Sequence, residues 1–289
     1  MLRLATRGSR LALWQAERVA ELLGGDVELI VVKTGGDQRR DEPIHAMGGT
    51  GVFVKEVQDA VLDGRADIAQ HSAKDLPSIT PDGLVLAAVP ERGDARDALI
   101  GSTLAALPRD ARVATGSVRR RAQLAAVRPD LEFAELRGNV DTRLAKAVDY
   151  DAIVLAAVGL DRLGLADHIA ERLDPEVVLP MVGQGALAVE CRADDDATLA
   201  RLAAIDDRDA HACVRAERQF LARLGGGCSL PCAAYAVVRD QRIVIDALLA
   251  ALDGSTVLRA HSEADDAAQA GDEAADAVFA QGGMELLGA

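Results

Sequence analysis

The feature that most constrains the fold is a unit of apolar strand and arginine-containing turn that occurs three times in succession. We expect the strands at residues 112–115, 131–136 and 151–157, each followed by a polar, glycine-containing turn that carries arginine. Strands that alternate with helices indicate an α/β domain with a largely parallel sheet. In such a sheet these turns meet at one edge, where ligands bind. Because arginine is suited to gripping carboxylate and phosphate, the sequence predicts an anion-binding edge.

The first of these turns leads into a helix expected over residues 118–127. Ser117 is a suitable N-cap for this helix. The first turn of the helix carries Arg119, Arg120 and Arg121. Positive side chains are unfavourable beside the positive end of a helix dipole. Their position therefore favours a bound anion, with a solvent-exposed basic face as the alternative.

The N-terminus has the same pattern. A strand is expected at residues 2–6 and a helix at 11–23, and Arg7 and Ser9 lie in the turn between them. A turn between a strand end and a helix N-terminus is a site where anions bind. A solvated turn is the alternative.

A third group of polar residues, His71-Ser72-Ala73-Lys74-Asp75, follows a short strand that begins at Ile68. Lys74 could bind an anion, while Asp75 could move protons or stabilise a cation. Acid–base work by a carboxylate needs a positioned, partly desolvated setting. The alternative is an exposed turn in which a lysine–aspartate pair contributes little.

Cys228 follows three glycines, at the end of a helix expected over residues 209–224. Consecutive glycines let the backbone pass close to another group. The negative end of a helix dipole would not lower the pKa of the thiol, so a covalent attachment point fits better than a redox or nucleophilic role. A buried thiol in a turn is the alternative. Beyond it, strands expected at 233–239, 242–250 and 256–262 are joined as hairpins at Asp240-Gln241 and Asp253-Gly254. With a final helix expected over 263–287, they indicate a small α+β domain.

Composition narrows the class of function. The 289 residues suit two or three domains, and all but four of the 32 basic residues are arginine. A net charge of −14 and 2% aromatic residues argue against binding to nucleic acid or an anionic membrane. The N-terminus does not read as a signal peptide and no apolar run is long enough to span a membrane, so a cytoplasmic location is expected.

A metal site is not expected. His211 and Cys213 stand two residues apart in an expected helix, so their side chains diverge. Cys228 and Cys232 form a second possible pair, but there is no further pair of the kind that structural zinc sites use.

Six segments together resemble the porphobilinogen deaminase family, also called hydroxymethylbilane synthases, from residue 2 to about residue 260. They read Ala-Thr-Arg-Gly-Ser at 5–9 with Leu-Trp-Gln at 13–15, His-Ser-Ala-Lys-Asp at 71–75, Thr-Gly-Ser-Val-Arg-Arg at 115–120, Leu-Arg-Gly-Asn-Val-Asp-Thr-Arg at 136–143, Gly-Gln-Gly-Ala at 183–186 and Gly-Gly-Gly-Cys at 225–228. The chain departs from the family at Gly116, often serine, and Ala73, often methionine, and Cys232 is an additional thiol.

The resemblance implies a monomer with two α/β domains like type II periplasmic binding proteins and a small α+β C-terminal domain. The chain would cross twice between the first two domains. Domain 1 would then comprise residues 1–91 and 186–206, domain 2 residues 92–185, and domain 3 residues 207–289.

The resemblance also implies an enzyme that joins four porphobilinogen molecules head to tail, with release of ammonia, to give the linear tetrapyrrole hydroxymethylbilane. A dipyrromethane primer, one per chain, would be attached through a thioether to Cys228. Asp75 would be catalytic, stabilising a cationic azafulvene-like intermediate and moving protons. The other implied cofactor-binding residues are Ser72, Lys74, Thr115, Ser117, Arg119, Arg120, Gly138 and Asn139. The implied substrate-binding residues are Arg7, Ser9, Arg137, Arg143 and Arg162.

Two other classes of function are weighed against this one. A carboxylate-binding protein without catalysis would explain the arginine-rich turns equally well, but it leaves Asp75 and Cys228 without a role. A zinc-stabilised nucleic-acid binder conflicts with the negative charge and the scarcity of aromatic residues. The polar, glycine-rich residues 34–50 are expected to form a long loop that could act as a lid.

Overall fold

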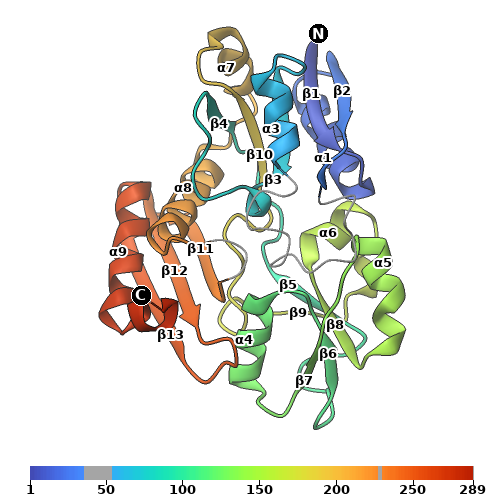
Figure 1. Ribbon diagram of the computed structural model, residues 1–289, viewed down its shortest axis with the longest axis vertical. Helices are drawn as coiled ribbons and strands as arrows, with labels where there is room; N and C mark the ends of the chain where they lie inside the picture. Colours follow the sequence, from blue (N-terminus) through green and yellow to red (C-terminus); the bar gives the residue numbers. More distant parts are fainter. Residues whose placement is uncertain (36–53, 227–229, 289) are drawn as a thin grey trace.

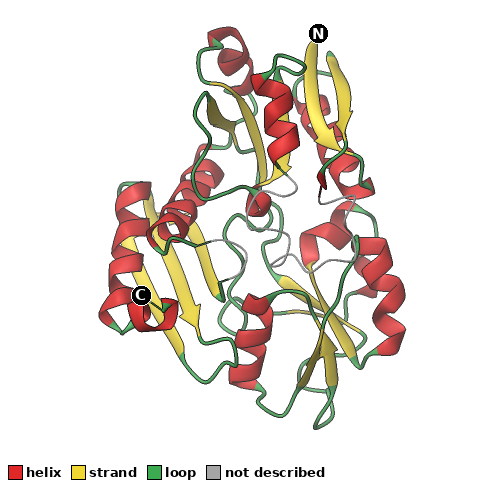
Figure 2. Cartoon of the chain, in the orientation of Figure 1, coloured by secondary structure: helices red, strands yellow, loops and turns green. Residues whose placement is uncertain are grey.

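The computed structural model describes residues 1–35, 54–226 and 230–288 (Figure 1). In these residues the chain forms three sheets, each with its own helices (Figure 2). Two α/β lobes lie one above the other in Figure 1, and a third lobe lies beside them. The expected fold class, two α/β domains and a small α+β domain, is confirmed. The described residues include no helix with the length and apolar character needed to cross a membrane.

The first lobe is built on a five-stranded sheet in the order β2-β1-β3-β10-β4. β1, β2 and β3 run parallel, whereas β10 is antiparallel to both of its neighbours. The strands are β1 (Leu2–Arg7), β2 (Val27–Val32), β3 (Ile68–Ser72), β4 (Leu84–Ala88) and β10 (Leu187–Arg192), and the helices are α1 (Arg10–Leu22), α3 (Lys55–Leu62), α7 (Asp196–Leu202) and the short 3-10 helix η2 (Ala73–Asp75).

The second lobe repeats this arrangement in the order β7-β6-β8-β5-β9. β6, β7 and β8 run parallel, and β5 is antiparallel to β8 and β9. The elements are β5 (Asp97–Ile100), β6 (Arg112–Ala114), β7 (Glu132–Ala134), β8 (Ala152–Ala156), β9 (Glu171–Arg172), α4 (Val118–Val127), α5 (Val140–Ala145), α6 (Ala157–Arg162) and the 3-10 helices η3 (Lys146–Asp149) and η4 (Ala166–His168).

The two antiparallel strands mark the crossings between the lobes. β5 is the first strand after the chain leaves the first lobe, and β10 is the first strand after it returns. The expected double crossing is therefore present. The exact domain boundaries given above stay a prediction.

The strand that re-enters the first lobe is shorter than the apolar run 179–189 suggests, since it begins only at Leu187. Gly183 (φ +70°) and Gly185 (φ +90°) adopt left-handed backbone that a strand does not contain. A Cβ on Gly185 would lie 2.5 Å from the Gly93 carbonyl oxygen, so the two crossing segments can touch only because this residue is glycine.

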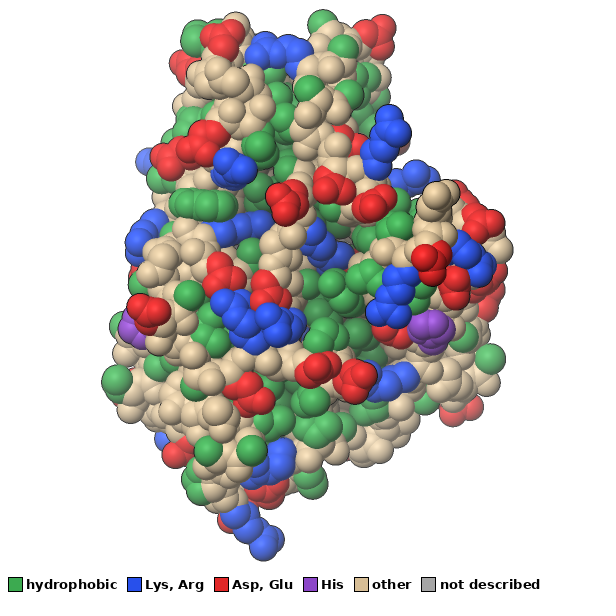
Figure 3. Space-filling view, turned by 180° about the vertical axis from the view of Figure 1, so that it is seen from behind, with side chains coloured by type: hydrophobic (Ala, Val, Ile, Leu, Met, Phe, Trp, Pro, Cys, Tyr) green, Lys and Arg blue, Asp and Glu red, His purple; other side chains and the backbone are tan. Residues whose placement is uncertain are grey.

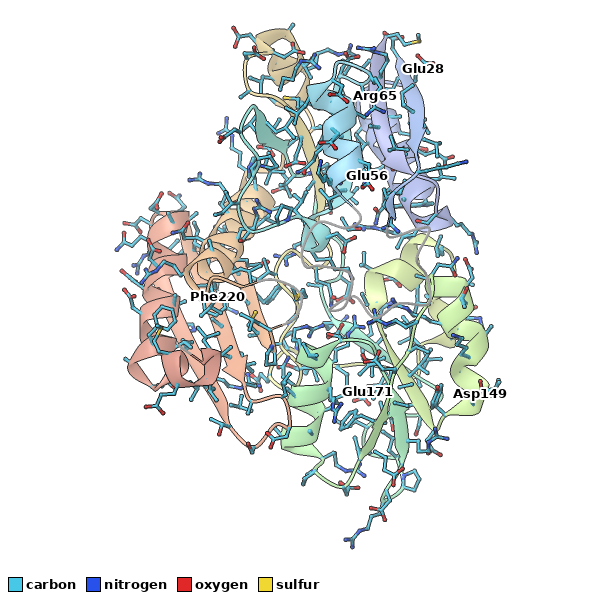
Figure 4. All side chains as sticks on the ribbon, viewed as in Figure 1. Glu28, Glu56, Arg65, Asp149, Glu171 and Phe220 are labelled. Atoms are coloured by element: carbon cyan, nitrogen blue, oxygen red, sulfur yellow. The ribbon has the colours of Figure 1, made fainter. Side chains whose placement is uncertain are left out.

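The third lobe is an antiparallel meander of β11 (Cys232–Arg239), β12 (Arg242–Ala250) and β13 (Val257–Ala264). Asp240 and Gln241 join the first two strands with positive φ at both positions, as a type I′ turn requires. The helices are α8 (Arg208–Arg223), α9 (Ala267–Ala280) and α10 (Gly283–Leu287). Phe220 on α8 is fully buried in the core of this lobe (Figure 4). The expected final helix begins later than predicted, because β13 extends to Ala264 and Asp266 then caps α9.

A buried ion pair ties the third lobe to the crossing segments. Arg92, on the first crossing, donates from Nη1 to Glu217 Oε1 at 2.6 Å and from Nη2 to Oε2 at 3.1 Å. Glu217 also accepts from the backbone N–H of Gly183 (2.7 Å) on the second crossing and of Ala236 (2.8 Å) on β11. One fully buried carboxylate therefore holds both crossings against the third lobe.

We expect Glu217→Gln to destabilise the fold by about 3–5 kcal/mol, because it leaves the Arg92 guanidinium buried without its counter-charge. Urea unfolding followed by circular dichroism measures the loss. Arg223→Ala, which removes half-exposed ion pairs of the same helix with Asp272 and Asp276, is the matched control and should change the unfolding midpoint far less. Equal shifts for the two variants would contradict this assignment.

Candidate active site

The arginine-containing turns of the second lobe meet at one edge of its sheet, as predicted. β6, β7 and β8 are parallel neighbours, so the turns that follow them leave from the same side. Arg162 belongs to α6 rather than to a turn, because β8 ends at Ala156 and helix follows directly. The arginines on these turns and on the helices that follow them are Arg119, Arg120, Arg137, Arg143 and Arg162.

Three of the predicted ligand-binding side chains are helix N-caps. Ser9 accepts from Ala12 N (3.3 Å), Ser117 from Arg120 N (3.4 Å), and Asn139 from Thr142 N (2.8 Å). Each cap satisfies an N–H that the helix leaves free. Among the described residues the two serine oxygens act as acceptors and their hydroxyl protons have no acceptor, so these protons can be donated to a carboxylate.

Thr115, Gly138 and Ser72 shape the same region. Thr115 is buried and its hydroxyl oxygen accepts from Ser117 N at 3.3 Å. Gly138 has φ +118°, and a Cβ there would lie 2.7 Å from Thr142 Cγ2, so glycine is required by both backbone and space. Ser72 exchanges hydrogen bonds with the Gln15 amide at 3.0 and 3.2 Å, which anchors the end of β3 on α1.

Arg119 and Arg120 share one buried carboxylate. Asp97, the first residue of β5, lies 2.7 Å from Arg119 Nη1 and 2.8 Å from Arg120 Nη2, and all three side chains are buried. Burial alone would raise the pKa of Asp97, but the two guanidinium groups hold it below its usual range. The sequence predicts an anion beside the arginines at this helix N-terminus, and the Asp97 carboxylate supplies part of that negative charge. Arg119 Nε has no hydrogen-bond partner among the described residues and remains available. Arg121 on the same turn is exposed and lies over the Phe133 ring.

Lys74 lies in η2, opposite these arginines. Burial, together with Arg120, lowers the pKa of Lys74 from 10.5 to about 8, while Asp75 and Asp97 act in the other direction. Neither Lys74 nor Asp75 has an ion pair or hydrogen bond from its side chain within the part of the chain that the structure describes. A half-buried ammonium without a partner favours an incoming anion.

Arg143, like Lys74, is a half-buried cation whose pKa is lowered. Burial, then Arg120 and Arg137, lower the pKa of Arg143 to about 10, and its Nε has no hydrogen-bond partner in the described residues. In the described part of the chain, the Arg137 side chain has one ion pair, a 3.5 Å contact of its Nε with Glu135 Oε2. Arg162 donates to the Gly185 carbonyl at 2.8 Å and lies 5.7 Å from the Trp14 ring, and burial lowers its pKa to about 10. Arg7 ends β1, on the side of the first lobe where α1 begins.

These contacts bring Lys74 and Asp75 from the first lobe into the electrostatic environment of Arg119, Arg120, Arg137 and Arg143 from the second. The cations of this cluster outnumber its carboxylates, although the whole chain carries a net charge of −14. Elsewhere the surface mixes both signs: Figure 3 shows acidic and basic side chains side by side over the back of the molecule. The cluster can hold a ligand with several carboxylates, and Asp75 is the carboxylate in it that is not already paired.

Some residues of this region were not singled out from the sequence. Asp97 stands at the end of the charged segment 91–97, yet it pairs with both Arg119 and Arg120 and accepts from Gln184 Nε2 at 2.9 Å. The usable signal was a single carboxylate opening the apolar run 98–100. Behind the His71–Asp75 segment, His71 Nε2 lies 3.2 Å from Glu190 Oε2, and both are buried. That pairing joins β3 to β10, and no pattern among neighbouring residues in the sequence predicts it.

Cys228, the predicted attachment point, and nearly all of the predicted loop at 34–50 lie outside the described residues. No group of three or more histidine, cysteine or acidic side chains is placed to hold a metal ion in the described ranges.

The lowered pKa of Lys74 can be measured by pulse acetylation with acetic anhydride across pH 6–11 and peptide mass spectrometry. The neutral amine reacts, so Lys74 should label with a midpoint near pH 8. Lys55 is the matched control, because its hydrogen bond and ion pair with Asp59 raise the pKa of its amine above 10.5. The unfolded chain binds this proton more tightly than the folded one, so the destabilising effect of Lys74 is present below pH 8 and is relieved between pH 8 and 10.5. Coincident midpoints for the two lysines would contradict the prediction.

Comparison with known proteins identifies the family. The family model described as "Porphobilinogen deaminase, dipyromethane cofactor binding domain" matches residues 2–200, and that described as "Porphobilinogen deaminase, C-terminal domain" matches residues 211–280. The porphobilinogen deaminase of Syntrophotalea carbinolica is 48% identical over 100% of this chain and 95% of its own. That of Roseiflexus castenholzii is 48% identical over 99% of this chain and 98% of its own. A solved periplasmic binding protein from Salmonella typhimurium covers 71% of this chain and 91% of its own, with a TM-score of 0.37 and 13% identity. The chain belongs to the porphobilinogen deaminase family.

Proposed function

We propose that this protein is a porphobilinogen deaminase, or hydroxymethylbilane synthase, of tetrapyrrole biosynthesis. It joins four porphobilinogen molecules head to tail, with release of four ammonia, on a covalently bound dipyrromethane. Family membership over the whole chain supports the reaction. The observation that carries the site is an unpaired carboxylate, Asp75, beside cations that lack enough counter-charges.

The charge of the ligand explains the arginines. Every pyrrole unit brings an acetate and a propionate, so the lengthening chain is a polyanion. Arginine binds carboxylate through a planar fork and stays charged at any physiological pH. Each hydrogen bond to a charged group contributes about 1.5–3 kcal/mol, so several such contacts can hold the chain while it grows.

For the dipyrromethane we propose Arg119, Arg120, Ser117 and Lys74 as the principal contacts, with Ser72, Thr115, Gly138 and Asn139 shaping the turns around it. The free Nε of Arg119 and the unpaired Lys74 support this assignment. When bound, the dipyrromethane supplies the pyrrole carbon to which the first substrate is joined. These residues suit the dipyrromethane in their chemistry, because they are cations and hydroxyl donors and the group carries four carboxylates.

For the incoming porphobilinogen we propose Arg7, Ser9, Arg137, Arg143 and Arg162. Arg143 supports this best, because its half-buried guanidinium has a lowered pKa and a free Nε. An arriving carboxylate relieves the repulsion that Arg120 and Arg137 exert on it.

Asp75 is the proposed catalytic residue. Loss of ammonia from porphobilinogen leaves a cationic, azafulvene-like carbon, and a carboxylate at this point stabilises that cation. It also holds the pyrrole N–H groups and takes up the proton that the coupling releases. Its place beside Lys74 and Arg143, on both of which it acts electrostatically, puts this carboxylate among the cations that hold the ligand.

Cys228 is the proposed attachment residue. The other three cysteines are buried, and burial raises the pKa of Cys191 to about 11 and of Cys213 to about 12. Cys232 is fully buried in β11. Exclusion of these thiols leaves Cys228 as the candidate for a thioether. We further propose a cytoplasmic monomer with the domain boundaries given above.

The covalent primer is tested by the intact mass of the purified protein and a peptide map. We expect additional mass equal to two linked pyrrole units on the peptide that contains Cys228. Cys228→Ala should abolish that mass, whereas Cys232→Ala, the matched control, should keep it. Modification of Cys232 instead would overturn the attachment site, and an unmodified protein that stays unmodified after incubation with porphobilinogen would count against the function itself.

The catalytic assignment is tested with Asp75→Asn. Loss of a positioned acid–base group lowers turnover by about 10²–10⁴-fold, measured as hydroxymethylbilane formed per enzyme. Carboxylate binding should remain, because the arginines are untouched. Asp82→Asn, an exposed aspartate in the following loop, should keep full activity. Full turnover by the Asp75 variant would favour a binding protein or a different catalytic group.

A further inference from the structure

A second arginine-lined pocket lies between the first and third lobes and uses none of the residues proposed above for binding or catalysis. It has a volume of about 230 Å³ and is lined by Ser78, Thr80, Arg215, Arg218, Gln219 and Ala268. Ser78 and Thr80 come from the loop between η2 and β4, which runs beside α8 in Figure 1, while Ala268 lies at the start of α9.

Arg218 is the buried cation of this pocket, with only 9% of its surface exposed. Its Nη2 donates to Thr80 Oγ1 at 3.1 Å. No carboxylate among the described residues lies within ion-pair distance of its guanidinium. Burial lowers the pKa of Arg218, and Glu190 only partly offsets this. A guanidinium taken out of water without a counter-ion is costly unless a ligand supplies one.

The other polar groups around the pocket are also available. Arg215 is exposed, and its side chain has no hydrogen bond or ion pair in the described part of the chain. Asp266, its acidic neighbour, is already engaged as the cap of α9 through Ala268 N and Gln269 N. Thr80 accepts from Arg218, so its hydroxyl proton is free to be donated. The Ser78 hydroxyl likewise has no partner among the described residues.

We propose that this pocket binds a small dianionic oxoanion, of the phosphate or short dicarboxylate class, between Arg215 and Arg218 with help from the hydroxyls of Ser78 and Thr80. At about 30 Å³ for each water molecule, this volume corresponds to roughly eight waters. Phosphate or succinate therefore fits, whereas a tetrapyrrole does not.

Such an anion would join two lobes. Thr80 belongs to the first lobe and the two arginines to the third, so a ligand that bridges them favours the assembled arrangement over one in which α8 has moved away. A ligand that binds only the folded form raises its stability by mass action. The expected effect is on stability, independent of turnover.

The test compares the thermal unfolding midpoint of the holoenzyme in sodium phosphate with that in sodium chloride at equal ionic strength, and repeats it with succinate. We expect the dianion to raise the midpoint of the wild type by roughly 2–4 °C when its concentration is about five times its dissociation constant. Arg215→Gln should lose at least half of the increase. Arg208→Gln, an exposed arginine on the same helix outside the pocket, is the matched control and should keep it.

The candidate active site also attracts anions, so the same measurement is made on Arg143→Gln. An increase that survives in Arg143→Gln and falls in Arg215→Gln supports the pocket, and the stronger of the phosphate and succinate responses identifies the ligand class. An increase that falls in Arg143→Gln and survives in Arg215→Gln, or no response to either anion, overturns it. Because the readout is unfolding, it stands apart from the proposed function, whose failure would appear as absence of hydroxymethylbilane.

Discussion

The contact of Asp97 with Arg119 and Arg120 is the interaction on which the candidate active site depends. Two arginines at the first turn of α4 would repel one another and the helix dipole if they were buried alone. Asp97 meets both guanidinium groups and is reached in turn by the Gln184 amide. Because Asp97 opens the first crossing strand and Gln184 precedes the second, the same carboxylate also holds the two connections together. The same carboxylate, Asp97, therefore sets part of the site's charge and joins the two connections between the lobes.

Glu217 provides the corresponding buried counter-charge in the third lobe. It pairs with Arg92 on the first crossing, and the backbone of Gly183 on the second donates to it. Both crossings are thus fixed by buried carboxylates, at Asp97 from within the second lobe and at Glu217 from the third. Breaking either pair leaves an uncompensated charge in the interior, which is more damaging than losing a surface contact. These ion pairs add to two apolar clusters that pack the third lobe against the others, one around Ala210 and Val214 and one around Leu248 and Ala250.

The local parts of this structure were predictable, and the distant pairings were not. Ser117 was expected to cap a helix, and the arginine turns were expected to share a sheet edge, because both follow from neighbouring residues and from strand direction. The hairpin at Asp240 and Gln241 likewise follows from the short connection between two alternating strands. Asp97 lies 23 residues from Arg120, and Glu217 lies 125 residues from Arg92. No local pattern specifies which carboxylate meets which arginine across such separations. The apolar run 179–189 is longer than the strand it contains for a related reason, since the left-handed glycines within it are required by the close approach of a second segment.

The incomplete neutralisation of the cluster is what makes it a binding site. Asp97 compensates only part of the charge of Arg119 and Arg120, and Lys74 and Arg143 have lowered pKa values because burial and the remaining arginines act on them together. A second buried carboxylate in this place would have stabilised the empty protein and weakened its attraction for carboxylates. The ligand instead supplies the missing negative charge, so the repulsion present before binding becomes part of the binding free energy. In an otherwise acidic chain, this local excess of positive charge surrounds Asp75 as well, since that carboxylate acts on both Lys74 and Arg143. The cations that hold the ligand's carboxylates therefore also place the ligand beside the proposed catalytic carboxylate.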